Sequence, residues 1–302
     1  MKKEKVFRIF AFIIYIFGIL YLNLSTRGFG IGLIVISMFL GLYILGISKN
    51  FLKDWLPFLF GFWAYEYTRG IADDIAKFFG ILPNFSIIYN LEKSIFFFLK
   101  EIPTIFLQQK FPPEMSSKIF LWILFFFYSS FFWIWAGTAL LIWLKKPEFF
   151  KNFIVSFLTL SFFGNLIFTI FPTMPPWYAS SIGEIAKVDR TMWSKIFPSG
   201  RMDFVRFWDG NEFAAFPSHH FGWTFFSALW LTKLFGKRWI LSFVFPIMIW
   251  FATIYGAEHY FVDGLFGGIL AFIFFKTFSK KSLENLDFQK IKNFLKEKFK
   301  LN

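Results

Sequence analysis

The sequence predicts an all-α integral-membrane protein, a polytopic bundle of about eight transmembrane helices. Its 302 residues are 57% hydrophobic and include 53 Phe and 13 Trp, and the mean hydropathy is +0.56. These values exceed those of soluble domains of similar length. Apolar runs of about 20 residues, the length that crosses a hydrocarbon core, also recur along the chain between charged connections.

Eight segments are long and apolar enough to be candidate spans. They are 6–24, 29–48, 54–70, 118–144, 149–171, 221–235, 239–257 and 259–276. Lys and Arg residues gather before the first segment and after the second, fourth, sixth and eighth. Because positive residues stay in the cytoplasm, this alternation predicts cytoplasmic termini and an extracytoplasmic position for the long connections 71–117 and 172–220.

The chain is predicted to form one integral-membrane domain over residues 1–302, since no domain boundary is evident. Its expected parts are two N-terminal spans in 1–50, a six-helix core in 51–276 and a basic amphipathic cytoplasmic tail in 277–302. Within the connection 71–117, the stretch "SIFFFLKEIPTIFLQQ" is too short to span and is broken by Lys100, Glu101 and Pro103. It predicts one or two helices lying at the membrane interface.

Composition also limits the chemistry. The chain has no Cys, which excludes disulfides, thiolate catalysis and Cys-ligated metals, and leaves His, carboxylates and hydroxyls to act. The net charge of +13 would suggest nucleic acid in a soluble protein, but here the basic residues border apolar runs. We therefore expect no nucleic-acid partner. We also expect no cofactor, and the sequence identifies no protein partner.

All three histidines lie where a polar loop meets an apolar run. His219 and His220 stand in "NEFAAFPSHHFGWTFF", and His259 stands in "YGAEHYFVDGLFGG". The Pro–Ser pair before the first two predicts a helix start with Ser218 as N-cap. The unpaired amides and the dipole of such a start attract an anion, which would lie beside His220.

His259 and Asp263 are four residues apart, a spacing that predicts one shared helix face. A carboxylate there can hold one imidazole nitrogen and leave the other as a nucleophile or base. The predicted zigzag places both histidine boundaries on the same side of the membrane. Three polar groups are therefore expected to converge at the level of the lipid head groups.

These residues carry a family resemblance. "FPSHH" and "EHYFVD" resemble the second and third motifs of the type-2 phosphatidic-acid phosphatase superfamily, Pro-Ser-x-His and His-x3-Asp. "FPTMPPWYA" at 171–179 makes the chain more similar to the inositol phosphorylceramide synthase branch. "DWLPFLFGFWAYEYTRG" at 54–70 looks like an early segment of bacterial and archaeal members of that branch. The resemblance covers roughly residues 50–276.

The resemblance implies a metal-independent lipid phosphatase or phosphotransferase with a phosphohistidine intermediate. It implies that His259 attacks phosphorus, Asp263 orients and charges that ring, and His220 protonates the leaving oxygen. The substrate would be a lipid phosphate or phosphodiester, and the acceptor would be water or an alcohol. No metal ligand is implied.

Two departures from the family pattern concern how phosphate is bound. The wider superfamily has Ser-Arg where this chain has Ala252 and Thr253, and its Lys-x6-Arg-Pro motif is absent near 171–179. Other cations must therefore meet the phosphate charge. The predicted phosphate- and substrate-binding set is Ser218, His219, Arg190, Arg201 and Arg69. Arg190 and Arg201 lie in the connection 172–220, and Arg69 lies inside an apolar segment, where an Arg is costly and usually functional.

Several alternatives remain open at this stage. His219 can be an interfacial polar residue, and Arg69 can belong to a structural ion-pair cluster with nearby acidic residues. The chain can be a metal-dependent hydrolase that uses the three histidines and Asp263 as ligands. It can also be a lipid transporter or lipid-binding protein without chemistry. The lipid itself is open among phosphatidate, phosphatidylglycerophosphate, polyprenyl phosphate and phosphoinositol donors.

The charge pattern makes a prediction about topology. A reporter fused after Asn302 should be active only in its cytoplasmic form, because the basic tail follows the eighth span. The measurement is a pair of reporters, one active only in the cytoplasm and one active only outside it. An extracytoplasmic reporter at this end would contradict the eight-span topology.

Overall fold

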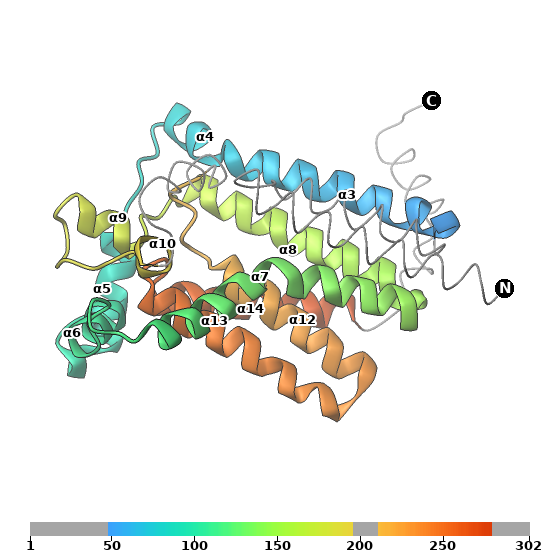
Figure 1. Ribbon diagram of the computed structural model, residues 1–302. Coiled ribbons are helices and arrows are strands. Elements are labelled where there is room, and N and C mark those ends of the chain that lie inside the picture. The colour runs from blue at the N-terminus through green and yellow to red at the C-terminus, as the bar shows by residue number, and fades with distance from the viewer. Residues whose placement is uncertain (1–47, 196–210, 280–302) are drawn as a thin grey trace, which may run out of the picture. The chain divides into compact units, whose positions relative to one another are not determined.

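The computed structural model describes residues 48–195 and 211–279. Every regular element in these ranges is a helix, so the predicted all-α class is confirmed (Figure 1). The predicted spans 6–24 and 29–48, the tail beyond residue 279 and Arg201 lie outside the described residues, apart from Ser48 itself.

The chain divides into two compact units, which are considered separately. The first contains residues 1–66 and 200–210, and the second contains 67–199 and 211–302. The described part of the first unit is most of helix α3, Ser48–Gly70. Its aromatic rings contact one another three or four residues apart, as in the pairs Trp55–Phe58 and Phe58–Phe62.

The second unit contains five long helices that match five of the predicted spans within a few residues at each end (Figure 1). They are α7 (Lys118–Lys145), α8 (Phe150–Ile170, preceded by the 3₁₀ turn η2, Pro147–Phe149), α12 (His219–Phe235), α13 (Val244–Tyr255, preceded by η3, Lys237–Phe243) and α14 (Phe261–Phe278). Among the described residues, four segments are long and apolar enough to cross a membrane: 118–145, 147–170, 237–255 and 261–278. Helix α12 is shorter and contacts α7, α8, α13 and α14, so it is the central helix of this group.

Local signals explain where α12 begins and ends. Ser218 is its N-cap, and the Ser218 hydroxyl accepts a hydrogen bond from the amide of Phe221, so the predicted helix start is confirmed. Gly236 ends the helix with a φ of 90°, a conformation that favours glycine. The chain therefore turns at once into η3 and returns along α13.

Glycines let α12 and α14 approach at backbone distance. A Cβ atom on Gly267 would lie 2.3 Å from the Ser218 carbonyl oxygen, and one on Gly222 would lie 3.0 Å from the Gly267 carbonyl oxygen. At the same contact the Ser218 amide donates to the Asp263 carbonyl oxygen over 2.9 Å. Small residues are the usual means of close helix packing in membranes. This packing holds the first turn of α12 against the first turn of α14.

Short helices fill the two long connections. The first connection forms α4 (Ala72–Phe78), α5 (Ser86–Ile95), η1 (Phe97–Leu99) and α6 (Pro103–Lys110). The chain breaks between η1 and α6 at Lys100, with a φ of 67°. The stretch predicted to form one or two interfacial helices thus contains the end of α5, the 3₁₀ turn η1 and most of α6, and its position at a membrane interface stays a prediction. The second connection forms α9 (Pro176–Ser181) and α10 (Thr191–Ser194). Thr173 makes isolated β-bridges to Asn84 and Ala214, which join both connections near the start of α12.

The contact between α12 and α14 makes a prediction about stability. Gly267→Ala should destabilise the folded protein by about 1–3 kcal/mol, because the new methyl group meets a backbone carbonyl that cannot move aside. The measurement is thermal unfolding of the purified protein in detergent, together with turnover once a substrate is known.

Gly137→Ala on α7 is the matched control, since a Cβ atom there meets no atom within 4 Å. It should leave the unfolding temperature unchanged or slightly raised, because Ala favours helix over Gly by about 1 kcal/mol. Equal stability of the two variants would contradict the importance of the close approach.

Candidate active site

The three predicted catalytic residues form a continuous chain of contacts. His220 Nδ1 lies 2.9 Å from His259 Nε2, and His259 Nδ1 lies 3.3 Å from Asp263 Oδ2. His259 is 4% exposed and Asp263 is fully buried. The contacts therefore run from the ring at the start of α12, through the ring of His259, to a carboxylate in the first turn of α14.

The contact between His259 and Asp263 forms differently from the sequence-based expectation. Helix α14 begins at Phe261, so His259 precedes the helix and the prediction of a shared helix face was wrong. Asp263 is the third residue of the helix, and its Oδ2 accepts the amide of Tyr260 over 2.8 Å. One carboxylate oxygen thus caps the helix start and also contacts the His259 ring.

A tight turn after α13 aims His259 at that carboxylate. Ala257 has a φ of 60°, a left-handed conformation that is uncommon for a residue with a side chain. The amides of Glu258 and His259 both donate to the carbonyl oxygen of Thr253, over 2.9 and 3.3 Å. These bonds close the end of α13 and fix the backbone of His259.

Aromatic side chains of α7 hold the ring of His220. Tyr128 stacks on it with ring centroids 5.2 Å apart, and Phe131 lies 4.4 Å away. Thr224, one turn further along α12, donates its hydroxyl to the His220 carbonyl oxygen. His220 is therefore fixed from two helices and faces His259.

His219 lies between α12 and α8. Its ring stacks on Trp223 and contacts Phe168 edge-on. A Cβ atom on Gly164 of α8 would lie 1.9 Å from His219 Nε2, so the ring fills the space that this glycine leaves. The placement agrees better with helix packing than with direct contact to a phosphate at His220.

Arg190 pairs with the residue that directly precedes the nucleophile candidate His259. Its Nε and Nη2 donate to the two carboxylate oxygens of Glu258 over 2.8 and 2.9 Å, and Glu258 directly precedes His259. The guanidinium also lies 4.2 Å from the centre of the Trp177 ring. Two planar contacts thus orient Arg190, and its charge acts on the His220 ring.

Arg69 also acts electrostatically on both His219 and His220. It lies at the end of α3, where its carbonyl oxygen accepts the side-chain amide of Asn211 over 3.2 Å. Arg69 and Arg190 therefore lie within electrostatic range of the His220 ring. The third predicted arginine, Arg201, is outside the described residues.

The structure adds residues that sequence reasoning missed. Trp177 stands in "FPTMPPWYA" and Glu258 stands in "EHYFVD", two of the quoted motifs. The pairing of Glu258 with Arg190 could not be predicted, because it depends on the path of the connection 172–220. Glu92 has no local sequence signal, because it looks like any polar residue of an amphipathic helix. Yet Glu92 is fully buried, and its Oε2 accepts the amide of Val262 at the start of α14. Burial, followed by the negative charge of Asp263, raises the pKa of Glu92 to about 8.

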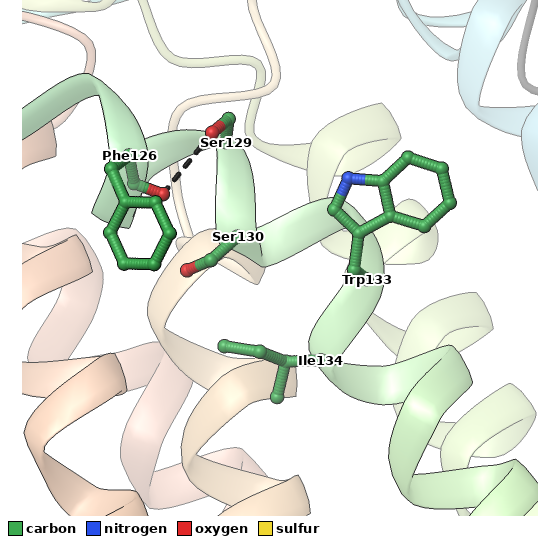
Figure 2. Close-up of a pocket in the computed structure, with 5 residues that line it drawn as sticks. All are labelled: Phe126, Ser129, Ser130, Trp133 and Ile134. Atoms are coloured by element: carbon green, nitrogen blue, oxygen red, sulfur yellow. Dashed lines mark hydrogen bonds between the residues drawn. The ribbon is translucent and has the colours of Figure 1, made fainter. Parts of the chain in front are cut away.

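A surface hollow of about 410 Å³ lies elsewhere on α7. Figure 2 shows its lining residues, Phe126, Ser129, Ser130, Trp133 and Ile134, with the Ser129 hydroxyl donating to the Phe126 carbonyl oxygen. At 100° per residue, this face of the helix points away from Tyr128, which contacts His220. None of the predicted site residues lines the hollow. Within the described ranges, no group of three or more His, Asp or Glu side chains is arranged as a metal site.

Fold and site together define a multi-pass membrane protein with a histidine–histidine–aspartate chain where two helices begin. The sequence profile of the PAP2 superfamily matches residues 91–277, which is more than half of the chain. The chain belongs to the PAP2 superfamily. The resemblance seen in the two histidine motifs is thereby confirmed.

Three curated relatives carry the name inositol phosphorylceramide synthase. The catalytic subunit of Schizosaccharomyces pombe is 31% identical over 145 residues, 44% of this chain and 33% of that protein. The catalytic subunit of Saccharomyces cerevisiae is 27% identical over 130 residues, 39% and 31% of the two chains. The enzyme of Candida albicans is 26% identical over 159 residues, 48% and 33% of the two chains. The matched region thus spans about a third of each relative, and no solved structure matches the chain.

The position of Arg190 makes a prediction about substrate binding. Arg190→Ala should lower kcat/KM by about 10²-fold or more, because a planar cation beside the reacting group stabilises phosphoryl charge. Arg190→Lys should recover little of this loss, since an ammonium cannot pair with Glu258 in the same two-bonded way. The measurement is steady-state turnover of a labelled lipid phosphate or phosphodiester.

Lys187→Ala is the matched control, because it removes an exposed positive charge from the same connection. Turnover by this control should stay close to that of the unaltered protein. If the Arg190→Ala and Lys187→Ala variants were equally active, Arg190 would have no role in binding phosphate.

Proposed function

We propose that this chain is an integral-membrane lipid phosphatase or phosphotransferase that works through a phosphohistidine intermediate. The observation that carries the proposal is the chain of contacts from His220 through His259 to Asp263. Membership of the PAP2 superfamily supports it, and so do the relatives named as inositol phosphorylceramide synthases.

The first chemical step is attack by His259 on phosphorus. Nε2 of His259 forms a bond to phosphorus while the bond from phosphorus to the leaving oxygen breaks. His220, in its protonated form, gives its proton to that oxygen. Asp263 holds the proton on Nδ1 of His259 and stabilises the positive charge that the phosphorylated ring carries.

The second step reverses these roles. The oxygen of water or of an alcohol attacks phosphorus, and His220 accepts the proton that this oxygen loses. The bond between His259 Nε2 and phosphorus breaks, which regenerates the neutral ring. Water as acceptor makes the protein a phosphatase, and an alcohol makes it a phosphotransferase.

Electrostatic stabilisation would come from two sources. The free amides in the first turn of α12, beyond the Ser218 cap, are partial positive charges directed at an anion beside His220. Arg190, which shares its charge with Glu258, and Arg69 are cations whose charge acts on that ring. Phosphoryl transfer depends mainly on such positioning and charge.

The donor and the acceptor are proposed as lipids. Because the relatives are named as synthases of inositol phosphorylceramide, a phospholipid donor with a lipid alcohol acceptor is the first pair to test. Hydrolysis of polyprenyl or glycerolipid phosphates is the second. The charge alternation along the chain supports an extracytoplasmic site with both termini in the cytoplasm, within one membrane domain.

The test is turnover of a panel of labelled lipid phosphates, phosphodiesters and alcohol acceptors by the purified protein in EDTA. At least one donor should be consumed, because the proposed chemistry uses side chains alone. His259→Ala and His220→Ala should each lower turnover by about 10²–10⁴-fold, and the double variant should be hardly worse than either, because the two rings act together.

Thermal unfolding of each variant serves as the control for folding.

A labelled phosphohistidine should accumulate in the unaltered protein when it is quenched during turnover, and His259→Ala should abolish it. Loss of all turnover in EDTA with recovery on adding a divalent cation would favour the metal-dependent alternative. Substantial turnover by either histidine variant would rule out the mechanism.

A further inference from the structure

Glu92 is a buried carboxyl group that the proposed reaction steps do not use. It stands on α5, a ten-residue helix outside the membrane-spanning segments, and its side chain is fully buried. Its Oε2 accepts the amide of Val262 over 3.2 Å. Glu92 therefore reaches from a peripheral helix into the first turn of α14, where Asp263 stands.

The packing around Glu92 brings more polar groups into the same buried region. Tyr260 and Val262 pack with Ile88 of α5 in one apolar cluster. Three polar atoms in this region are buried without a hydrogen-bond partner among the described residues: Glu92 Oε1, Asp263 Oδ1 and Tyr260 Oη. A buried polar atom without a partner costs about 1–3 kcal/mol, so the protonation of this group of residues matters for stability.

A neutral Glu92 suits this region better than an ionised one. Two ionised carboxylates would place two negative charges in one buried region, whereas a protonated Glu92 carries one O–H donor among acceptors. Burial, followed by the charge of Asp263, raises the pKa of Glu92 to about 8. The charges of Asp263, Glu92 and Tyr89 all act on Tyr260, so these groups form one coupled set.

We propose that Glu92 is a positioning residue: its neutral carboxyl group fixes the first turn of α14 and keeps a second carboxylate charge away from the buried side of His259. This rests on the proposed function of His259 as nucleophile. Among the titratable groups, Asp263 from α14 acts on Glu92 directly, and Glu92 in turn acts on Tyr260 in the turn before α14, together with Tyr89 from α5.

Ionisation of Glu92 should lower activity for two reasons. A second negative charge near the His259–Asp263 pair favours the positively charged form of the imidazole, which cannot attack phosphorus. The same charge repels the anionic substrate. Activity should therefore be retained while Glu92 is protonated and fall as the pH rises through about 8.

The first test is the pH profile of kcat/KM for the unaltered protein and for Glu92→Gln. The glutamine keeps a carbonyl oxygen for the Val262 amide and stays neutral at every pH. Loss of the His220 proton lowers kcat/KM in both proteins as the pH rises, so the comparison between them carries the test. Between about pH 6.5 and about pH 9 the unaltered protein should lose about tenfold more than Glu92→Gln does. An alkaline fall of the same size and midpoint in both proteins would overturn the proposal.

Glu114→Gln is the matched control, because it makes the same chemical change at a side chain that is 64% exposed. It should keep the profile of the unaltered protein. Glu92→Ala, which removes the acceptor for the Val262 amide, should lower kcat at every pH and unfold at a lower temperature. Full kcat in Glu92→Ala would also overturn the proposal.

The second test does not depend on catalysis, so it separates this proposal from the proposed function. A carboxyl group whose pKa is higher in the folded state than in the unfolded state stabilises the folded protein fully at a pH below the unfolded-state pKa. This stabilisation is lost as the pH rises towards the folded-state pKa. The unfolding temperature of the unaltered protein should therefore fall relative to Glu92→Gln between about pH 5 and about pH 8 and then stay level. Parallel curves over this range would refute a neutral buried Glu92, even if no lipid of the panel is turned over.

Discussion

The contact between the first turns of α12 and α14 is the constraint on which the candidate site depends. Only a residue without a side chain allows the carbonyl oxygen of Ser218 to lie over Gly267, and the amide of Ser218 then bonds to the carbonyl oxygen of Asp263. Because both helices begin at this contact, their first side chains face the same small volume. His220 comes from one helix start, and Asp263 from the other. A shift of either helix along its axis would separate them.

Two sets of charged side chains lie close to His259. Asp263 is fully buried on one side of the His259 ring, while Glu258 and Arg190 form an ion pair next to the same residue. A carboxylate alone beside an incoming phosphate would repel it, and the two-bonded contact with Arg190 offsets that charge. The same contact holds the guanidinium close to the site without long side-chain motion. The ion pair thus neutralises the charge of Glu258 and orients the guanidinium of Arg190.

The features predicted correctly from the sequence are those that leave a local signal in it. The scarcity of histidine, the Pro–Ser helix start and the apolar runs predicted the all-α class, the N-cap at Ser218 and the segments that converge. It was wrong about the start of α14, because the four-residue spacing suggested a shared helix face, whereas Asp263 caps a helix that begins after His259. Glu92 could not be found at all, since its burial depends on how α5 folds back onto α14. Such long-range contacts leave no periodic or local pattern.

The hydrogen bond between His220 and His259 bears on how a substrate would bind, in addition to stabilising the fold. In the proposed mechanism Nε2 of His259 is the nitrogen that must reach phosphorus, and in the structure this atom lies 2.9 Å from Nδ1 of His220. Under that mechanism, a phosphoryl group that entered between the rings would replace this bond, so that one ring would face phosphorus and the other would face the leaving oxygen. The rings are already fixed, one by Tyr128 and Phe131 and the other by Asp263, so little ordering remains when the substrate arrives. The resting contact therefore keeps the two rings aligned in the absence of substrate.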